Sequence, residues 1–455
     1  MRGTLGPGRP GQDDADRPGR ALRPSDRRAR DHRVHEARRP DLPGRRGGAD
    51  PGPRARADAR PGGRLRHSRV GDPSVSLFVS CGEISGDLYA AGLIRALLAH
   101  DPALRGRIWG MMGPRAEAAR GAADPGLPHW SYEELKLMGI TEVLPAIPRI
   151  LRLRRGMVRA ILERRPETVV VIDSPDFHLG LVSKLRRSGY TGRAVCLVPP
   201  TVWAWRSGRV RALRRDFDLC LPLFGFEHRY LAERGVNSRW KVHPLLAELR
   251  DTRAPDGLRR RIEGARAVAL MPGSRRYDIR YHLETLVETA RLLRADGRLP
   301  VFSIAPGLSP PLAAELRERL SGFETWEGEG RELMDAAEAV AGVSGTVSVE
   351  AMLLRRYMVV IYNGNALSWA LARALVRIPY ISIPNYLTDG PIYPELLRGD
   401  ARPDRIVREL YRYTDDPGVR AEADRRMEAA RRAMGTGDAA AFWARCILEG
   451  GGDGP

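Results

Sequence analysis

Cysteine, lysine and long apolar runs are all scarce in this 455-residue chain. Its four cysteines are widely separated and form no Cys-x-x-Cys pair, which argues against a disulfide framework and a cysteine-based zinc site. No apolar run reaches the roughly 18 residues of a membrane-spanning helix, and no apolar segment of the kind found in secretory signals occurs near the N-terminus. We therefore expect a cytoplasmic protein without a spanning helix.

Residues 1–73 differ in composition from the rest. Residues 1–70 contain 19 arginines, 9 acidic residues, and neither lysine nor an aromatic residue, so about half of the net charge of +19 lies there. Such a segment cannot offset the entropy of ordering itself, and we expect it to be disordered. One interpretation is a basic arm for nucleic acid or anionic lipid. We favour another, a start codon assigned too early in a GC-rich genome, and expect no nucleic-acid partner.

A strand, a glycine-containing turn and a helix recur from Ser74 onward. Predicted strands cover 75–80, 168–172, 194–198 and 219–223, and a second series covers 267–271, 301–305, 339–343 and 358–362. The polar region at 245–265 separates the two series. The predicted fold class is α/β: two doubly wound parallel-sheet (Rossmann-like) domains, 74–250 and 251–448, that face a cleft. The second domain is predicted to end in a helical tail.

Ligands of parallel sheets bind at the carboxyl ends of the strands, and unusual residues follow the predicted strands of the first half. Asp173 ends an apolar strand and is the candidate general base, with a helix cap as its alternative role. Asp176 is assigned to the helix cap. A turn before a helix is a candidate acceptor or phosphate site, although a purely structural turn explains it equally well; it contains Gly82, Glu83, Ser85 and Gly86.

Two tryptophans and an arginine follow the next strand. Trp203, Trp205 and Arg206 can stack on a sugar or acyl chain and hold a phosphate, and the alternative is a pair of core aromatics. His243 is a candidate for lining the cleft, although most lone histidines are ordinary core or surface residues. Asp216-Phe217-Asp218 resembles the Asp-x-Asp metal motif of sugar transferases. We interpret that pair as structural because Asp218 directly precedes a strand, and we expect no metal site.

The second half contains two further turns after strands. Pro272, Gly273, Ser274 and Arg275 lead into a helix and form a candidate cradle for a diphosphate. Ser344, Gly345 and Thr346 open another helix, and Glu350 follows about one turn later. A carboxylate there can accept both hydroxyls of a ribose, and its alternative role is to balance the helix dipole. These residues are the candidate UDP-sugar site.

Taken together, these motifs resemble the lipid-A-disaccharide synthase family over residues 74–400. The resemblance is carried by Gly-Glu-x-Ser-Gly-Asp at 82–87, Leu-Met-Gly-Ile-Thr-Glu-Val-Leu at 137–144, Ile-Asp-Ser-Pro-Asp-Phe at 172–177, Val-Trp-Ala-Trp-Arg at 202–206, His-Pro-Leu at 243–245, Pro-Gly-Ser-Arg at 272–275, Ser-Gly-Thr at 344–346 with Glu350, Tyr380 to Asn385, and Pro-Glu-Leu-Leu at 394–397. No single motif is as specific as this order and spacing.

The resemblance implies a GT-B fold and an inverting transfer without a metal or cofactor. It implies UDP-2,3-diacylglucosamine as donor and 2,3-diacylglucosamine 1-phosphate (lipid X) as acceptor, joined by a β-1,6 link. Asp173 matches the family's catalytic aspartate and Arg275 an arginine of its nucleotide site. A related UDP-sugar transferase, an epimerase, or a non-catalytic scaffold remain alternatives, and a homo-oligomer is compatible with the sequence.

Acylated substrates also imply a peripheral position on the inner face of the cytoplasmic membrane of a Gram-negative-type bacterium. An apolar set recurs at helical spacing among arginines, as in helices that lie on anionic lipid; it comprises Val143, Leu144, Ile147, Ile150 and Leu151. The alternative is a helix packed on its own sheet.

The sequence departs from the family pattern at Val242 before His243, at Gly225, at Thr388-Asp389-Gly390-Pro391 and at Arg398. The last two lie near the nucleotide motifs and bear on donor choice.

Overall fold

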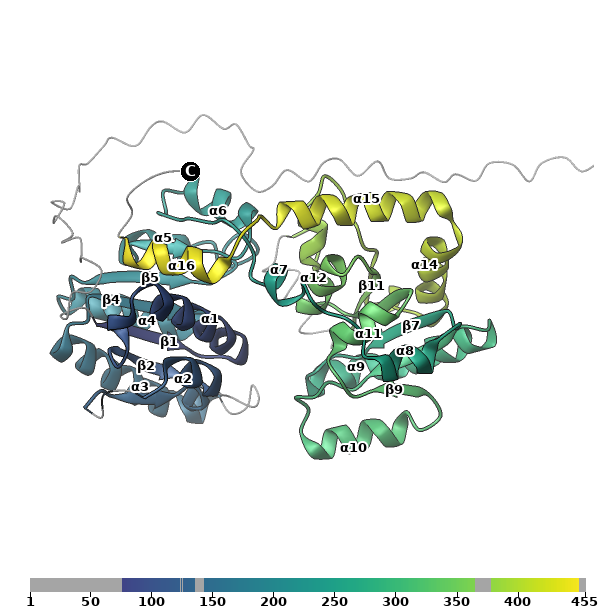
Figure 1. Cartoon of the computed structure of the whole chain (residues 1–455), viewed down its shortest axis with the longest axis horizontal. Helices are drawn as coiled ribbons and strands as arrows, with labels where there is room; N and C mark the ends of the chain where they lie inside the picture. The colour runs from purple at the N-terminus through teal and green to yellow at the C-terminus, as the bar shows by residue number, and fades with distance from the viewer. Residues whose placement is uncertain (1–75, 123, 125, 136–142, 365–377, 450–455) are drawn as a thin grey trace, which may run out of the picture. The chain divides into compact units, whose positions relative to one another are not determined.

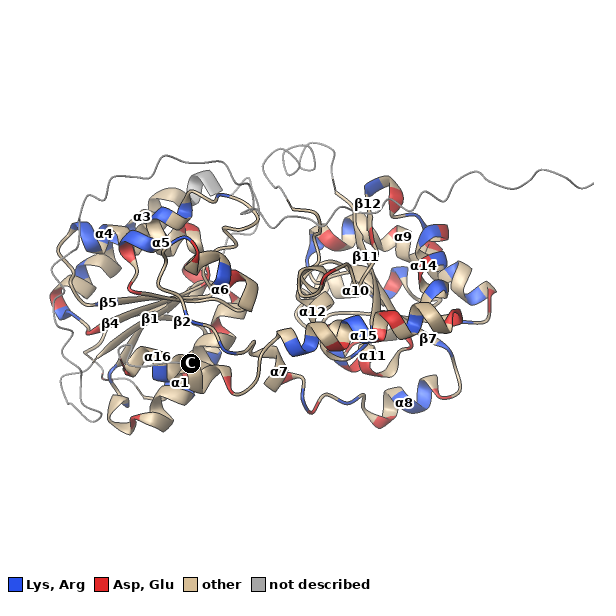
Figure 2. Cartoon of the chain, turned by 90° about the horizontal axis from the view of Figure 1, so that it is seen from above, with Lys and Arg blue, Asp and Glu red and all other residues tan. Residues whose placement is uncertain are grey.

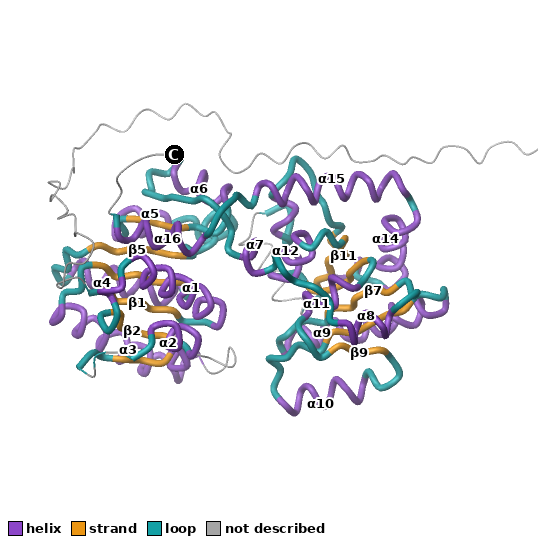
Figure 3. Tube along the Cα trace, viewed as in Figure 1, coloured by secondary structure: helices purple, strands orange, loops and turns teal. Residues whose placement is uncertain are grey.

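The computed structural model describes residues 76–449 except 123, 125, 136–142 and 365–377. The predicted extension 1–73 and residues 137–142 of the family motif lie outside this part. Two six-stranded parallel sheets occur in the described chain, and helices alternate with their strands (Figures 1 and 3). The predicted α/β class and the two doubly wound sheets are confirmed.

The first sheet has the order β3-β2-β1-β4-β5-β6. Its strands are β1 (Leu77–Cys81), β2 (Ile108–Met112), β3 (His129–Ser131), β4 (Thr168–Ile172), β5 (Arg193–Leu197) and β6 (Leu219–Leu221). The order runs outward in both directions from β1 and β4, so the topological switch point lies between these two strands. All residues of both strands are buried, which explains their nearly continuous apolar sequence.

Helices cover both faces of this sheet. On one face, α1 (Ile84–His100) and α2 (Pro114–Arg120) contribute Leu93, Leu97 and Ala116 to a core cluster. On the other face, a second cluster includes residues of α3 (Val143–Arg164), α4 (Pro175–Arg187) and α5 (Arg209–Asp216). The short helix α6 (Gly225–Ala232) follows β6 and contributes Leu231 to this second cluster.

The second sheet has the order β12-β11-β10-β7-β8-β9, with its switch point between β7 and β10. Its strands are β7 (Ala267–Met271), β8 (Leu299–Ser303), β9 (Glu324–Trp326), β10 (Ala339–Val343), β11 (Tyr357–Tyr362) and β12 (Glu395–Leu397). Its helices are α8 (Asp256–Ile262), α9 (Arg276–Ala295), α10 (Pro310–Arg319), α11 (Gly330–Ala336), α12 (Thr346–Leu353), α14 (Pro403–Asp415) and α15 (Pro417–Ala433), and α7 (Leu245–Glu248) precedes them.

The last helix, α16 (Ala439–Leu448), packs on the first sheet domain. Trp443 is 2% exposed and its ring meets Tyr89 of α1 edge to face. Arg193 of β5 donates hydrogen bonds to the carbonyl oxygens of Cys446 and Ile447. The assignment of the whole tail to the second domain is therefore wrong for α16, because its apolar face completes the core around α1.

In the described part of the chain, no helix combines the length and the apolar character that crossing a bilayer requires.

Candidate active site

The switch point of the first sheet brings two predicted motifs together. Cys81, the last residue of β1, pairs with Ile172, the last residue of β4. The Gly82 turn and Asp173 follow directly after these residues and therefore lie side by side at the carboxyl edge. The Gly82 amide donates a hydrogen bond to Oδ1 of Asp173 at 3.2 Å.

Asp173 has an unusual backbone conformation and leaves little space around it. Asp173 and Ser174 have φ values of 54° and 41°, left-handed conformations that cost a non-glycine residue about 1–3 kcal/mol. A Cβ atom at Gly86 would lie 1.9 Å from Oδ2 of Asp173, and one at Gly82 would lie 2.2 Å from Oγ of Ser174. Both glycines of the motif are therefore required because the Asp173–Ser174 turn packs directly on them.

Burial raises the pKa of Asp173 from 3.8 to about 7, against the lowering effect of hydrogen bonds from Ser174 and the Gly82 amide. Its Oδ2 is buried and makes no hydrogen bond of good geometry within the described residues, although the nearby Gly86 amide also lowers the pKa. A carboxylate with a pKa near neutrality and one uncommitted oxygen can accept a proton from a hydroxyl group.

His178 fixes the Asp173 backbone, a role that the sequence did not suggest. Nδ1 of His178 lies 2.7 Å from the carbonyl oxygen of Asp173, and Nε2 lies 2.8 Å from Oγ of Ser80. Because the carbonyl can only accept, Nδ1 carries the proton and Nε2 accepts from the Ser80 hydroxyl. Burial lowers the pKa of His178 to about 4, so the ring stays neutral.

The rest of the first motif divides into exposed and buried residues. Glu83, the N-cap residue of α1, and Ser85 in its first turn are exposed. Asp87 is buried and accepts from the amides of Gly113, Arg115 and Ala116, so it anchors the start of α2. This aspartate has a structural role.

The two tryptophans have different surroundings. Trp203 donates to Glu227 at 3.0 Å and packs edge to face against Phe226 and Tyr386, as the core-aromatic alternative predicts. Trp205 is 37% exposed, and the guanidinium of Arg206 lies 4.4 Å from its ring centroid. Of the two tryptophans, Trp203 is half-buried and Trp205 is exposed, so Trp205 is the better placed to stack on a ligand.

Asp176 does not cap α4, contrary to the prediction. The N-cap residue is Ser174, and Asp176 lies in the first turn. Its carboxylate accepts from Arg206 at 3.0 Å and also from Arg209. Pro175 explains the shift, because proline is favoured at the first helical position and the cap must precede it.

His243 has the surroundings of a core histidine. It is 3% exposed, its Nδ1 accepts from the Leu245 amide at 3.2 Å, and its ring lies 4.6 Å from that of Phe224. Burial lowers its pKa to about 3, so it is neutral. This arrangement favours the structural alternative over contact with a ligand.

The Asp216–Asp218 pair is structural, as interpreted from the sequence. Asp216 accepts from Arg215 at 2.8 Å, and Asp218 accepts from Arg186 and from the Ala194 amide. Among the residues that the structure describes, no group of three or more acidic, histidine or cysteine side chains is arranged to hold a metal ion.

The switch point of the second sheet contains the predicted nucleotide motifs. Gly273 follows β7 with φ +98°, and Arg275 is the N-cap residue of α9. The first amides of a helix have no intrahelical acceptor, and they carry partial positive charge. The Arg275 side chain is exposed and makes no hydrogen bond or ion pair within the described residues. The start of α9 therefore combines unpaired backbone amides with an exposed arginine, an arrangement that suits an anion.

The second motif of this sheet follows β10, the neighbour of β7. Ser344 donates to the carbonyl oxygen of Ile381 at 3.2 Å, and Thr346 begins α12. Burial raises the pKa of Glu350, and Arg331 opposes that rise. Glu350 lies beyond the first turn of α12, which has no acidic residue, so a role in balancing the helix dipole is not supported.

A hydrogen-bond network holds the segment 380–395 together, and the sequence did not predict it. Asn385 is buried, donates to Glu395 and Tyr393, and accepts from the amides of Ile392 and Tyr393. Glu395 also accepts from the amides of Ile381 and Ser382. A buried amide with every hydrogen-bonding group satisfied rigidifies the loop that contacts Ser344.

The predicted membrane-facing set on α3 has mixed exposure. Ile147 is 42% exposed, Leu151 is half-buried, and Ile150 is half-buried against the core. The side chains of Val143 and Leu144 lie outside the described residues. Farther along, Leu153, Met157 and Ile161 face the sheet. The second half of the helix thus packs on its own sheet, which was the alternative to membrane contact. Membrane contact at the start of the helix stays a prediction.

Comparisons with known proteins agree with this architecture. A family model described as Lipid-A-disaccharide synthetase matches residues 77–435. A lipid-A-disaccharide synthase from Myxococcus xanthus (strain DK1622) is 34% identical over 381 residues, covering 82% of this chain and 97% of that protein. One from Pseudomonas aeruginosa (strain UCBPP-PA14) is 36% identical over 379 residues, covering 81% and 96%.

Similar solved structures share the fold at low identity. A putative UDP-N-acetylglucosamine 2-epimerase from Listeria monocytogenes has a TM-score of 0.53 at 12% identity, covering 82% of this chain and 95% of that chain. The S. aureus MnaA–UDP co-structure has a TM-score of 0.53 at 10% identity with the same coverage.

The two doubly wound sheets, with unusual residues at both switch points, define a protein of the GT-B class. The family match over most of the chain is more specific. The chain belongs to the lipid-A-disaccharide synthase family and is a glycosyltransferase of lipid A biosynthesis.

Proposed function

We propose that this chain transfers 2,3-diacylglucosamine from UDP-2,3-diacylglucosamine to lipid X. The 6-hydroxyl of the acceptor attacks the anomeric carbon from the face opposite UDP, the bond from that carbon to the UDP oxygen breaks, and Asp173 takes the hydroxyl proton. The products are a β-1,6-linked disaccharide 1-phosphate and UDP. The observation that carries this proposal is the Asp173 carboxyl, held at the switch point by the Gly82 amide with its second oxygen uncommitted.

The second sheet domain would bind the nucleotide. Arg275 and the first amides of α9 offer donors to the diphosphate, whose negative charge grows as the sugar departs. The turn 344–346 and Glu350 would hold the uridine ribose. We propose that the two switch points face a shared cleft.

Both proposed substrates carry acyl chains, so the chain would work at the inner surface of the cytoplasmic membrane. Exposed Ile147 and the arginines of α3 support contact with anionic lipid. Membership of this family makes an epimerase or a different UDP-sugar transferase less favoured than lipid A disaccharide formation.

Mass spectrometry of the reaction product tests this proposal. The purified chain is incubated with UDP-2,3-diacylglucosamine and lipid X, and in parallel with UDP-N-acetylglucosamine and lipid X. We expect the tetraacyl disaccharide 1-phosphate in the first reaction and unchanged sugar nucleotide in the second. A 2-epimer in the second reaction, or transfer of a non-acylated sugar at the same rate, would contradict the proposed substrate.

A further inference from the structure

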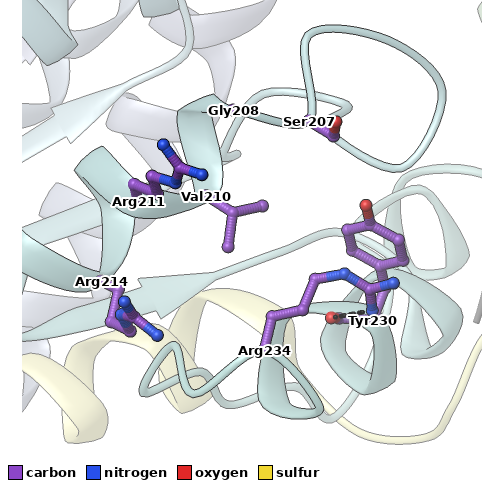
Figure 4. A pocket seen from close by; sticks show the side chains of 7 residues that line it. All are labelled: Ser207, Gly208, Val210, Arg211, Arg214, Tyr230 and Arg234. Atoms are coloured by element: carbon purple, nitrogen blue, oxygen red, sulfur yellow. Dashed lines mark hydrogen bonds between the residues drawn. The ribbon is translucent and has the colours of Figure 1, made fainter. Parts of the chain in front are cut away.

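A basic pocket on the first sheet domain is not part of the site described above. It has a volume of about 420 Å³ and lies between α5 and α6 (Figure 4). Its lining residues are Ser207, Gly208, Val210, Arg211, Arg214, Tyr230 and Arg234. Three of these seven are arginines and none is acidic, so the lining has a strong excess of positive charge.

The charges of two of these arginines are not balanced locally. Arg211 and Arg214 are three residues apart on α5, which places them on one face of the helix, where like charges repel. Both are exposed, and the side chain of neither makes a hydrogen bond or an ion pair within the part of the chain that the structure describes. The acidic groups nearest in sequence are already engaged, Asp216 by Arg215. A bound anion would relieve the repulsion.

The third arginine is held in position. The guanidinium carbon of Arg234 lies 3.6 Å from the ring centroid of Tyr230, and its NH1 donates to the Tyr230 carbonyl oxygen at 3.1 Å. The Tyr230 hydroxyl donates to the carbonyl oxygen of Val202 at 3.3 Å, which fixes the ring in turn. Glu233 lies 3.5 Å away and offsets part of this charge. An ordered guanidinium presents a fixed set of donors that suits phosphate oxygens.

Side chains, not backbone amides, would hold the anion. The amides of Val210 and Arg211 bond to the carbonyl oxygens of Ser207 and Gly208 at 3.1 and 3.2 Å, so they are occupied. The exposed Ser207 hydroxyl lies at the rim and can add a donor.

The surrounding face is also basic. Helices α3, α4 and α5 share one core cluster and therefore cover the same face of the sheet. Lysine and arginine residues are frequent on these three helices (Figure 2), among them exposed Lys184 and Arg187 of α4. Such a face attracts phosphates displayed on a lipid surface.

We propose that the pocket binds the phosphate group of a lipid, through Arg211, Arg214 and Arg234. This deepens the proposed function, because that function requires lipid substrates. The phosphate can belong to a bilayer headgroup or to the sugar 1-phosphate of the acceptor, and both sources share the same chemistry.

Two binding measurements that need no turnover test the proposal. The first is sedimentation with phosphatidylcholine vesicles with and without phosphatidylglycerol, and the second is calorimetric titration with glucosamine 1-phosphate. The full chain is compared with R211Q/R214Q and with K184Q/R187Q, which removes equal charge from exposed side chains of α4 on the same face outside the pocket. We expect R211Q/R214Q to weaken binding roughly tenfold or more in at least one measurement, and K184Q/R187Q to weaken it much less.

If R211Q/R214Q weakens vesicle binding, the phosphate belongs to a bilayer headgroup. If it weakens the binding of glucosamine 1-phosphate, the phosphate belongs to the acceptor sugar. Equal weakening by the two variants would mean diffuse surface charge, and no weakening by R211Q/R214Q would mean no site; either result overturns the pocket assignment. Both variants change exposed side chains, so their melting temperatures should stay close to that of the unmodified chain. Because neither measurement involves sugar transfer, failure of the proposed reaction would leave the test intact.

Discussion

At the scale of single residues, the burial of Asp173 should be visible in the stability of the fold. Its folded-state pKa is about 7 against the ordinary aspartate value of 3.8, so between these pH values the folded chain retains a proton that the unfolded chain has lost. Stability therefore falls as pH rises through this window and stays lower above it. Asp173→Asn removes this penalty. We expect its melting temperature to exceed that of the unmodified chain near about pH 8, and the difference to shrink towards about pH 4; equal differences at both pH values would mean that the carboxyl is not desolvated.

Arg275 gives a second test with its neighbour as a control. Arg275 is exposed and has no partner within the described residues, whereas Arg276 lies 3.8 Å from Glu315. We expect Arg275→Ala to weaken UDP binding about tenfold or more, because a charge-assisted contact with phosphate is lost. Arg276→Ala should change it little. Calorimetric titration with UDP measures both, and equal losses would show that only the general positive charge matters.

At the scale of elements, the contact between α1 and the turn after β4 determines where the carboxyl lies. A Cβ at Gly86 would meet Oδ2 of Asp173 at 1.9 Å, whereas one at Gly92, on the same helix, has Ala440 at 3.8 Å as its nearest neighbour. Gly86→Ala should therefore displace Asp173 and lower kcat by roughly 100-fold, the scale of a general base. Gly92→Ala should keep full activity and gain a little stability. Steady-state kinetics of both variants decide this, and full activity of Gly86→Ala would refute the close packing.

Many elements of the fold could be predicted from the sequence, and the misses have physical causes. The buried central strands β4, β7 and β10 are short apolar runs, and their predicted bounds of 168–172, 267–271 and 339–343 match the structure. The strands β3, β9 and β12 were missed because edge strands of three residues with exposed or half-buried positions have no apolar run to recognise. The sequence also does not predict β2, a fully buried strand whose short apolar run is interrupted by Gly110.

The candidate site was predictable only in part. Asp173 and Arg275 could be chosen because they follow buried strands of parallel sheets. The role of His178 could not be seen, because it depends on contacts with Ser80 and with a left-handed carbonyl that local sequence does not reveal. The requirement for glycine at position 86 likewise arises from its contact with Asp173, which lies 87 positions later in the sequence.

At the scale of the whole molecule, the last helix, α16, packs on the first sheet domain and completes the core around α1. After α15 the chain passes Gly435, whose missing Cβ would lie 2.0 Å from the Lys241 carbonyl oxygen, and then forms α16. Trp443→Ala removes a buried aromatic from the core around α1, which typically costs about 3–5 kcal/mol. We expect hydrogen exchange to accelerate in the strands β1–β6 while the strands β7–β12 stay protected. Arg445→Ala, an exposed change on the same helix, is the control. Equal acceleration in both regions would mean that α16 does not belong to the first domain.

We propose that Asp173 serves as the base in sugar transfer without contributing to nucleotide binding. The rate of disaccharide formation by Asp173→Asn, measured together with its affinity for UDP, tests this role. We expect the rate to fall by about 100-fold or more, with unchanged UDP affinity. Sugar transfer by this variant at the normal rate would contradict the role of Asp173 as the base.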